Sequence, residues 1–391
     1  MRLRRSLLYL MAVMFMRGIA GGITQPIISI YLRTQGLSIM ELGILGAGMG
    51  AGLLIFEPIW GVLADRGLNK KILIMSCVFT PFITFSYTAI RGIWALFSLM
   101  FFSGFAMSAM GVSSRGLTAS YHHRRGKAFG RWYATIGLAG LIGPSIGGYL
   151  AGIEYSLPFY ASAMVSFFAL FAAIWVVDPK IGVEGETRAE QHPNPSVTTT
   201  SSLRALIGSR ALIVTSFLII FPCFNFSVVN TFLPVYVKES PRFLFSELEI
   251  GLMFTVVNVV GIPTQLLFGE LSDRVGRKAM IILGMVFDSL TFWVLPFIAG
   301  GYQLYFTVAI IAVARAAVNP IMLALMVDNV PLSLQGKAIG IYGALEDLGI
   351  LLGPMVAGYA YQYYGPTLSF HMCAVLMLFG VIWAYVLLRK M

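Results

Sequence analysis

Charged residues are scarce in this chain. Only 27 Lys and Arg and 17 Asp and Glu occur among 391 residues. They make up 11% of the chain, whereas soluble domains carry about 25%. A soluble fold of this length needs a polar surface that this composition cannot supply. The composition therefore excludes a cytosolic enzyme, a nucleic-acid-binding protein and a disordered chain.

Cysteine is also rare, and the common motifs of nucleotide and metal chemistry are missing. Cys77, Cys223 and Cys373 lie far apart in apolar segments, so they indicate neither a disulfide framework nor a metal site. The sequence contains no G-x4-G-K-[ST] phosphate-binding loop and no H-E-x-x-H metal motif. We therefore expect no cofactor, no metal ion and no enzymatic activity.

Long apolar segments dominate instead, and 58% of the residues are hydrophobic. A membrane-spanning helix needs about 20 such residues. The polar stretch 178–208, rich in Pro, Ser and Thr, divides the candidate segments six and six. The sequence thus predicts an all-α integral membrane protein with twelve transmembrane helices, a six-helix half at 1–177, a linker at 178–208 and a six-helix half at 209–391. The predicted segments are 6–32, 38–64, 71–90, 93–118, 128–152, 157–177, 210–237, 247–270, 279–299, 302–327, 338–361 and 366–388.

The distribution of Lys and Arg predicts the orientation in the membrane. Twenty of the 27 fall in loops and ends on the side that includes the N-terminus, and only four fall on the other side. Cytoplasmic loops are enriched in Lys and Arg, so we expect both termini in the cytoplasm. The net charge of +10 is then a topology signal and does not require a nucleic-acid partner. The first apolar segment is too long for a cleaved signal peptide, and we expect it to be retained.

The second half of the sequence repeats the first at an offset of 208 to 210 residues. GVLADRGLNKK at 61–71 aligns with GELSDRVGRKA at 269–279, and GKAFG at 126–130 aligns with GKAIG at 336–340. Six helices separate the copies, so the two halves have the same orientation. Parallel repeats of this kind are one of the plans of secondary transporters, with the substrate site between the halves near the bilayer midplane.

The repeated loop resembles the cytoplasmic motif G-x-L-x-D-R-x-G-R-K of the major facilitator superfamily, and the resemblance extends over essentially the whole chain. The first copy departs from it at Leu68 and Asn69, where Gly and Arg are usual. The resemblance implies a conformational gate, in which Gly61 lets its helix approach the eleventh helix and Asp65 lies at that helix's positive N-terminus. The gating residues are Gly61, Asp65, Arg66 and Lys70 in the first copy, and Gly269, Asp273, Arg274, Arg277 and Lys278 in the second.

A second motif resembles the helix-packing signature G-x8-G-x3-G-P-x2-G-G of this family's antiporters. Small residues at these intervals allow close helix packing, and the proline can bend the helix. The resemblance points to exchange-type transport, often drug export against protons. The matching residues are Gly143, Pro144, Gly147 and Gly148 in the fifth helix, and Gly349, Gly353 and Pro354 in the eleventh.

Ionisable residues inside the apolar segments are candidates for function, because each costs about 2.5 to 3.5 kcal/mol in hydrocarbon unless it faces a cavity or a partner. By resemblance, Arg17 and Arg315 lie on helices that line the central cavity, and Asp288 lies on a peripheral helix, where a structural role is expected. An internal salt bridge is the alternative for each arginine. Neutral hydrogen bonds to a substrate could come from Gln25, Asn225, Asn230 and Asn319.

Three acids are candidates for proton coupling. Glu57 shares one helix face with Gly61 and Asp65 and is the only acid deep in the first six segments. Glu346 lies at a similar depth in the eleventh segment, and two carboxylates at one interface raise each other's pKa. Asp347 is the competitor on the opposite side of the same helix. The alternative is that each acid pairs with an arginine or with water.

The resemblance implies a secondary active transporter that moves a small molecule by alternating access, as a proton-coupled exporter of small hydrophobic compounds. Uptake or facilitated diffusion of a polar metabolite or organic anion stays open because of Arg17 and Arg315, and so does a polytopic membrane enzyme or receptor. Drug antiporters of the family usually carry an arginine that would fall at 100–103, where this chain has none. We expect a monomer in the plasma membrane, with lipid, protons and a small-molecule substrate as its partners.

The predicted topology can be tested by labelling a cysteine in the linker. A membrane-impermeant maleimide should label Ser196→Cys from the cytoplasmic side only. Arg91→Cys, in a loop predicted to lie outside, is the matched control and should be labelled only from the outside. Labelling of Ser196→Cys in intact cells would contradict the orientation.

Overall fold

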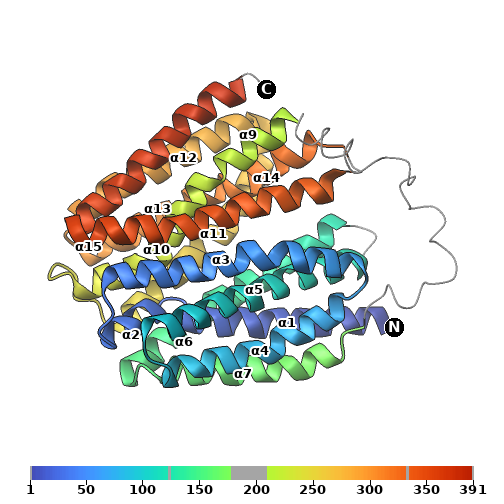
Figure 1. Ribbon diagram of the computed structural model, residues 1–391. Helices are drawn as coiled ribbons and strands as arrows, with labels where there is room; N and C mark the ends of the chain where they lie inside the picture. Colours follow the sequence, from blue (N-terminus) through green and yellow to red (C-terminus); the bar gives the residue numbers. More distant parts are fainter. Residues whose placement is uncertain (1, 122–124, 178–208, 332–333, 390–391) are drawn as a thin grey trace. The chain divides into compact units, whose positions relative to one another are not determined.

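The computed structural model describes residues 2–121, 125–177, 209–331 and 334–389. Every regular element among them is a helix (Figure 1), which confirms the all-α prediction. The predicted linker at 178–208 lies outside the described residues, so the division of the chain into 1–177 and 209–391 stays a prediction.

The helices follow the predicted segments closely. The first half forms α1 (Arg2–Thr24), α2 (Ile28–Thr34), α3 (Ile39–Asp65), α4 (Asn69–Ala89), α5 (Ile93–Tyr121), α6 (Arg125–Ile153) and α7 (Leu157–Ile174). The second half forms α9 (Arg210–Leu218), α10 (Ile220–Glu239), α11 (Glu247–Val275), α12 (Arg277–Val294), the 3-10 turn η2 (Leu295–Phe297), α13 (Gly301–Ala316), α14 (Asn319–Asp328) and α15 (Gln335–Arg389).

The described residues form 11 helical spans that are long and apolar enough to cross a membrane. The last of them, within α15, is interrupted at Gly365, which has a φ of +86°. Glycine tolerates this left-handed backbone, and Pro366 disfavours a helical conformation in the residue before it. The two arms of α15, at 335–364 and 366–389, correspond to the last two predicted segments.

Three of the predicted segments are broken, although each was predicted as one continuous helix. α9 ends at Leu218 and α13 ends at Ala316, four residues before Pro222 and Pro320 respectively. A proline ring clashes with the carbonyl group four residues earlier and lacks the N–H that would continue the helix. The break between α1 and α2 contains Pro26 for the same reason. The prolines were the available signal in the sequence.

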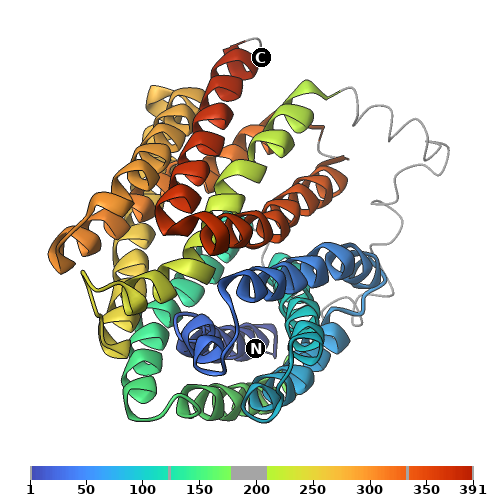
Figure 2. The ribbon, with the colours of Figure 1, turned by 60° about the vertical axis from the view of Figure 1, so that its left-hand side comes forward.

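The chain divides into two compact units. The first unit holds the helices of the first half together with Asn230–Asn258, and the second holds the rest of the second half. In the first unit α1 packs on α6 and α7, and α5 packs on α3 and α4. In the second unit α12 packs on α13 and α15. Figures 1 and 2 show α1 to α7 gathered in one bundle from two directions.

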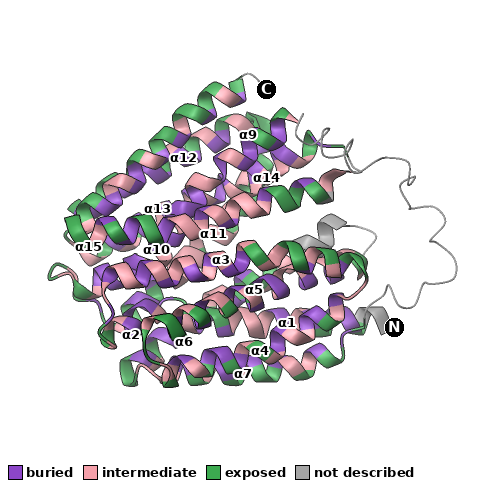
Figure 3. Ribbon diagram, viewed as in Figure 1, coloured by how far each residue is buried: buried purple, intermediate pink, exposed green. Residues whose placement is uncertain are grey.

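The helices bury one side and expose the other, as Figure 3 shows. Many exposed residues are large and apolar, for example Phe82, Trp94 and Phe306. Such a surface would aggregate in water and is suited to contact lipid.

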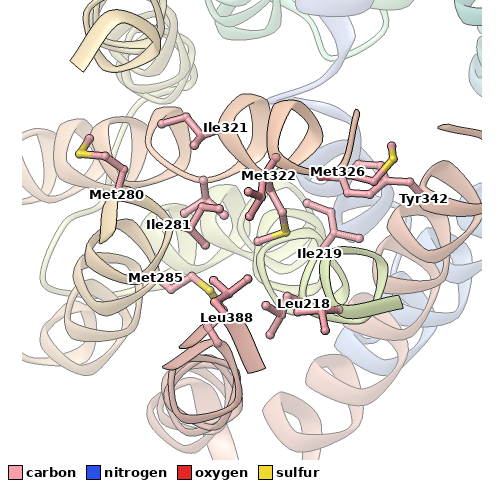
Figure 4. Packing of buried hydrophobic residues seen from close by; sticks show 14 of the residues in the cluster. Leu218, Ile219, Met280, Ile281, Met285, Ile321, Met322, Met326, Tyr342 and Leu388 are labelled. Carbon is pink, nitrogen blue, oxygen red and sulfur yellow. The ribbon is translucent and has the colours of Figure 1, made fainter. Parts of the chain in front are cut away.

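In the second unit the buried side forms a methionine-rich core between α9, α12, α14 and α15, with Met280, Met285, Met322 and Met326 among its members (Figure 4). Methionine fills irregular gaps between helices without polar atoms.

The glycines of the helix-packing motif allow backbones to meet. A Cβ atom added to Gly147 would lie 2.0 Å from the carbonyl oxygen of Ile23 on α1, and one added to Gly148 would lie 2.4 Å from that of Glu247 on α11. Gly143 likewise packs against Gly22 on α1. A Cβ atom added to Gly143 would lie 2.8 Å from the Cα atom of Gly22. Pro144 lies within the same helix. Only glycine permits these contacts, as the motif predicts.

The second copy of the motif makes the same kind of contact. A Cβ atom added to Gly349 would lie 2.6 Å from the carbonyl oxygen of Ile220, and one added to Gly353 would lie 2.5 Å from that of Phe224. Both contacts are between α15 and α10, and Pro354 follows directly in α15. The motif therefore has a packing role in both halves.

Replacing Gly147 with alanine should destabilise the protein strongly. The added methyl group has no room beside Ile23, and overpacking of this kind costs about 1–3 kcal/mol. The matched control is Gly152→Ala, five residues further along α6, where a Cβ atom meets no described atom within 4 Å. Thermal unfolding in detergent should give a clearly lower Tm for Gly147→Ala alone. Equal Tm values would contradict this assignment.

Candidate transport and coupling site

The second unit contains a buried hydrogen bond between an amide and a carboxyl group. Asn225 Nδ2 on α10 donates to Asp288 Oδ2 on α12 at 2.9 Å. Both residues are 2% exposed, so the interaction is shielded from solvent and lipid. In the described part of the chain, the remaining oxygens Asn225 Oδ1 and Asp288 Oδ1 have no hydrogen-bond partner.

Arg315 on α13 is the cation of this region. Its guanidinium carbon lies 3.8 Å from the centroid of the Phe226 ring, in the arrangement of a cation–π contact. Asp288 and Glu346 both lie within electrostatic range of Arg315. Arg315 therefore interacts electrostatically with acids on two different helices, α12 and α15.

Glu346 and Asp347 add two further carboxyl groups from α15. The Cys223 thiol donates to Glu346 Oε1 at 3.8 Å, and Asp347 lies within electrostatic range of the same cysteine. Glu346 contacts Cys223 on α10, and Gly349 and Gly353 also lie against α10. We call Asn225, Asp288, Arg315, Glu346 and Asp347 the α10–α15 polar cluster.

The cluster unites two of the predicted cavity residues, Asn225 and Arg315, with two of the predicted coupling acids. It also includes Asp288, for which the resemblance implied only a structural role on a peripheral helix. The sequence did carry a signal, because a lone acid in an apolar segment needs a partner. The identity of that partner, Asn225, depends on the packing of α10 against α12 and could not be derived from spacing. Asn319 begins α14 in the same unit, and its Oδ1 is buried without a hydrogen bond among the described residues.

In the first unit Arg17 is held by neighbouring helices. Its Nη1 donates to Ser166 Oγ on α7 at 3.0 Å, and Cys77 on α4 lies within electrostatic range. The Nε atom is buried and makes no hydrogen bond to the described residues. Arg17 therefore has a hydrogen-bond partner that is not an acid, whereas the alternative weighed from the sequence was an internal salt bridge.

Gln25 and Asn230 were both predicted to supply hydrogen bonds, and they contact each other. Gln25 Nε2, at the break between α1 and α2, donates to Asn230 Oδ1 on α10 at 2.6 Å. Further along the same helices Arg33 Nε lies 2.7 Å from Glu239 Oε1. Residues from the two halves of the sequence are thus joined by polar contacts within the first unit.

A second set of polar contacts surrounds Glu247 at the start of α11. Lys238 Nζ lies 2.7 Å from Glu247 Oε1, and the Tyr155 hydroxyl donates to the same oxygen. Burial and the neighbouring Glu247 carboxylate raise the pKa of Tyr155 above its usual value. Tyr155 therefore remains a neutral donor to this carboxylate.

Glu57 has an arginine partner. Its Oε1 lies 2.5 Å from Arg115 Nη2 on α5, and both side chains are partly exposed. This pairing with an arginine is the alternative that the sequence left open for Glu57. The shared interface between Glu57 and Glu346 stays a prediction, because the two acids belong to different units.

Comparison with known proteins identifies the family. A family model described as "Major Facilitator Superfamily" matches residues 10–243 and 224–390. The chain belongs to the Major Facilitator Superfamily. It is therefore a multi-pass membrane protein that transports small molecules, and not an enzyme.

Relatives within the Major Facilitator Superfamily match most of the chain at low identity. "Multidrug resistance protein 2" of Bacillus subtilis (strain 168) is 24% identical over 360 residues, which covers 89% of this chain and 87% of the relative. "Quinolone resistance protein NorA" of Staphylococcus aureus (strain MRSA252) is 24% identical over 348 residues, covering 86% and 85%.

Solved structures confirm the major facilitator fold. The nucleoside transporter NupG aligns with a TM-score of 0.78 at 15% identity and covers 98% of each chain. A bacterial homolog to the human lysosomal transporter Spinster, in an inward-facing and unoccupied conformation, aligns with a TM-score of 0.81 at 14% identity and covers 99% of this chain and 97% of the other. At these identities the likeness establishes the fold alone.

The gating motif of the Major Facilitator Superfamily differs between its two copies here. In the second copy Arg277 lies 3.5 Å from Asp273 and also forms an ion pair with Asp328 at the end of α14. In the first copy Asn69 takes the place of that arginine, is buried, and donates to the carbonyl oxygen of Ala64 at 3.2 Å. At this position the second copy therefore makes a charged contact and the first copy a neutral one.

The remaining gating residues are placed as a polar motif requires. Asp65, Arg66, Asp273 and Arg274 are exposed, and Lys70 and Lys278 are half-buried. An added Cβ atom at Gly61 or Gly269 would meet no described atom within 4 Å. Packing inside the units therefore does not require these glycines, and the predicted approach of Gly61 to the eleventh helix stays a prediction.

The ion pair between Arg33 and Glu239 predicts an efficient crosslink. With both residues replaced by cysteine, a short cleavable bis-maleimide should join α2 to α10, because the parent side chains are in direct contact. Cys77, Cys223 and Cys373 are buried and should react little. The control pair Arg91→Cys and Glu239→Cys should remain uncrosslinked, as measured by mass spectrometry after proteolysis. Equal yields from the two pairs would contradict the contact.

Proposed function

We propose that this transporter exports small, mainly hydrophobic compounds from the cell in exchange for protons. It acts as a monomer in the plasma membrane, with both termini in the cytoplasm. The observation that carries the proposal is that two relatives named for multidrug and quinolone resistance match more than four fifths of the chain. The lipid-facing composition and the buried acids support the same function.

Proton coupling requires a group that gains and loses a proton within the membrane, and arginine remains charged throughout. In the α10–α15 polar cluster, Asp288 and Glu346 lie within electrostatic range of Arg315, and Asp347 lies within the same range of Cys223. Charges in hydrocarbon are costly unless they are paired. A carboxyl group in such a place can take up and release a proton, which an arginine cannot. Glu346 and Asp347 are the coupling acids proposed for this half.

Glu57 is the proposed coupling acid of the first half. Its carboxylate forms an ion pair with Arg115, and the coupling role proposed here requires this pair to open. The pair therefore acts as a switch, in which Arg115 and a proton alternate as partners of the carboxylate. Arg17 and Arg315 bias the electrostatic potential along the transport path, and Gln25, Asn230 and Asn319 offer neutral hydrogen bonds to the substrate.

Gradient-driven transport by single variants distinguishes the acids. In proteoliposomes with an imposed pH gradient, Glu57→Gln should abolish accumulation of a hydrophobic dye such as ethidium, because the proton has lost its site. Dye binding and downhill exchange should remain, since the neutral amide has nearly the same shape. Asp347→Asn, the corresponding acid-to-amide variant in the second half, is measured in the same assay.

Normal accumulation by Glu57→Gln together with lost accumulation by Asp347→Asn would assign the proton to Asp347. If the wild-type protein accumulates no compound of a panel of hydrophobic cations, neutral drugs and organic anions, the export proposal is wrong.

Uptake or facilitated diffusion of a polar metabolite or organic anion is the second candidate. It is favoured by Arg17 and Arg315, whose guanidinium groups lie inside apolar helices and attract anions. Arg17 is bonded to Ser166 and Arg315 is close to acids, so neither charge is dedicated to a substrate. Inward flux of an anion without proton movement would favour this candidate over export.

A further inference from the structure

Asp288 is surrounded on every side by helices of the second unit, and the groups that face it are few. The Asn225 amide approaches from α10, Arg315 lies within electrostatic range on α13, and Cys373 lies within the same range on α15. Cys373 is fully buried and acts as a neutral neighbour. Arg315 is thus the cation that faces this carboxyl group among the described residues.

The hydrogen bonds of Asn225 and Asp288 are complementary and incomplete. The amide N–H of Asn225 already donates to Asp288 Oδ2. The two oxygens left over, Asn225 Oδ1 and Asp288 Oδ1, are both buried acceptors without a partner in the described structure. A buried acceptor without a donor costs about 1–3 kcal/mol. Among the described residues, the pair therefore has two buried acceptors and lacks a donor hydrogen for them.

A proton on Asp288 supplies that hydrogen. Protonation forms an O–H bond at Oδ1, and a neutral carboxylic acid can donate where a carboxylate can only accept. The acid and the amide then satisfy each other through two hydrogen bonds, from Asn225 Nδ2 to Asp288 Oδ2 and from Asp288 Oδ1 to Asn225 Oδ1. The proton comes from water at the membrane surface and returns to water when it leaves.

Arg315 provides the alternative partner for the ionised carboxylate. Its Nε is buried without a hydrogen bond to the described residues, and it lies within range of both Asp288 and Glu346. When Asp288 is ionised, Arg315 balances its charge. When Asp288 is protonated, the cation is released to Glu346. Protonation of Asp288 on α12 is thereby linked to the charge balance around Glu346 on α15.

We propose that Asn225 and Asp288 form a proton-binding pair, with Arg315 replacing the proton when Asp288 is ionised. The inference rests on the proposed proton-coupled export and adds a site that the coupling acids Glu57, Glu346 and Asp347 do not include. Asp288 is a proton carrier in this scheme, and Asn225 is the residue that positions it.

Infrared difference spectroscopy tests the pair without a substrate. The full-length protein in lipid nanodiscs is titrated from alkaline to acidic pH, and the carboxylic C=O band that appears on acidification is recorded. Part of this band should be lost in Asp288→Asn. In Asn225→Leu it should move to higher frequency, because the acid has lost its hydrogen-bonding partner. Ser289→Ala, at the adjacent buried position that donates to the Ala374 carbonyl, is the control and should keep the wild-type band.

An unchanged band in Asp288→Asn, with a Tm close to that of Ser289→Ala, would overturn the proposal, because Asp288 would then not titrate. If Asp288→Asn does not fold, an unshifted band in Asn225→Leu overturns it in the same way.

Ethidium transport in proteoliposomes tests whether the pair takes part in coupling. Asp288→Asn should lose gradient-driven accumulation while it still binds ethidium, as measured by fluorescence. Accumulation at the wild-type rate would overturn the role in coupling. Failure of the wild-type protein to transport any compound would reject the export proposal alone, because the infrared result does not depend on a substrate.

Discussion

The interior of a bilayer offers no water, so every polar group that enters it must find its partner within the protein. This constraint explains why the described backbone is helical throughout its regular elements, since a helix satisfies its own N–H and C=O groups. It also explains why apolar residues such as Phe82 and Trp94 are exposed, while Asn225 and Asp288 are buried and hydrogen-bonded to each other. Two helix breaks, after Leu218 and Ala316, lie four residues before a proline, whose missing N–H leaves the carbonyl group at the break without its usual donor.

Close backbone packing is shared by the two halves, but their charges are arranged differently. Gly147 on α6 and Gly353 on α15 each press against a carbonyl group of a neighbouring helix. In the first unit Glu57 is matched by Arg115. In the second unit Arg315 faces more than one acid. The two halves thus share the packing contacts, while their charged contacts differ.

Features that depend on neighbouring residues could be predicted from the sequence, and contacts between residues distant in the sequence could not. Helix positions depend on local composition and spacing, and the structure reproduces them. The packing glycines could also be found from spacing, and in both halves they lie against neighbouring backbones. The pairs Gln25–Asn230 and Asn225–Asp288 could not be derived, because each joins residues that are distant in sequence. Hydrogen-bond partners of this kind depend on helix rotation, which an apolar segment with little amphipathic character does not specify. Asp288 shows the consequence, since its depth was predicted but its partner was not.

The two loop motifs show how a charged contact can be lost from one repeat. Arg277 pairs with Asp273 and Asp328, and at the offset of 208 residues its position in the first half holds Asn69. At 208 to 210 residues before Asp328, Thr118 to Ser120 carry no charge. A buried or half-buried charge without its partner is destabilising, so the loss of one member favours the loss of the other. Asn69 instead caps the turn through the Ala64 carbonyl, a contact between neutral groups that can be buried. At this position the first loop is therefore held by a neutral contact and the second loop by a charged one.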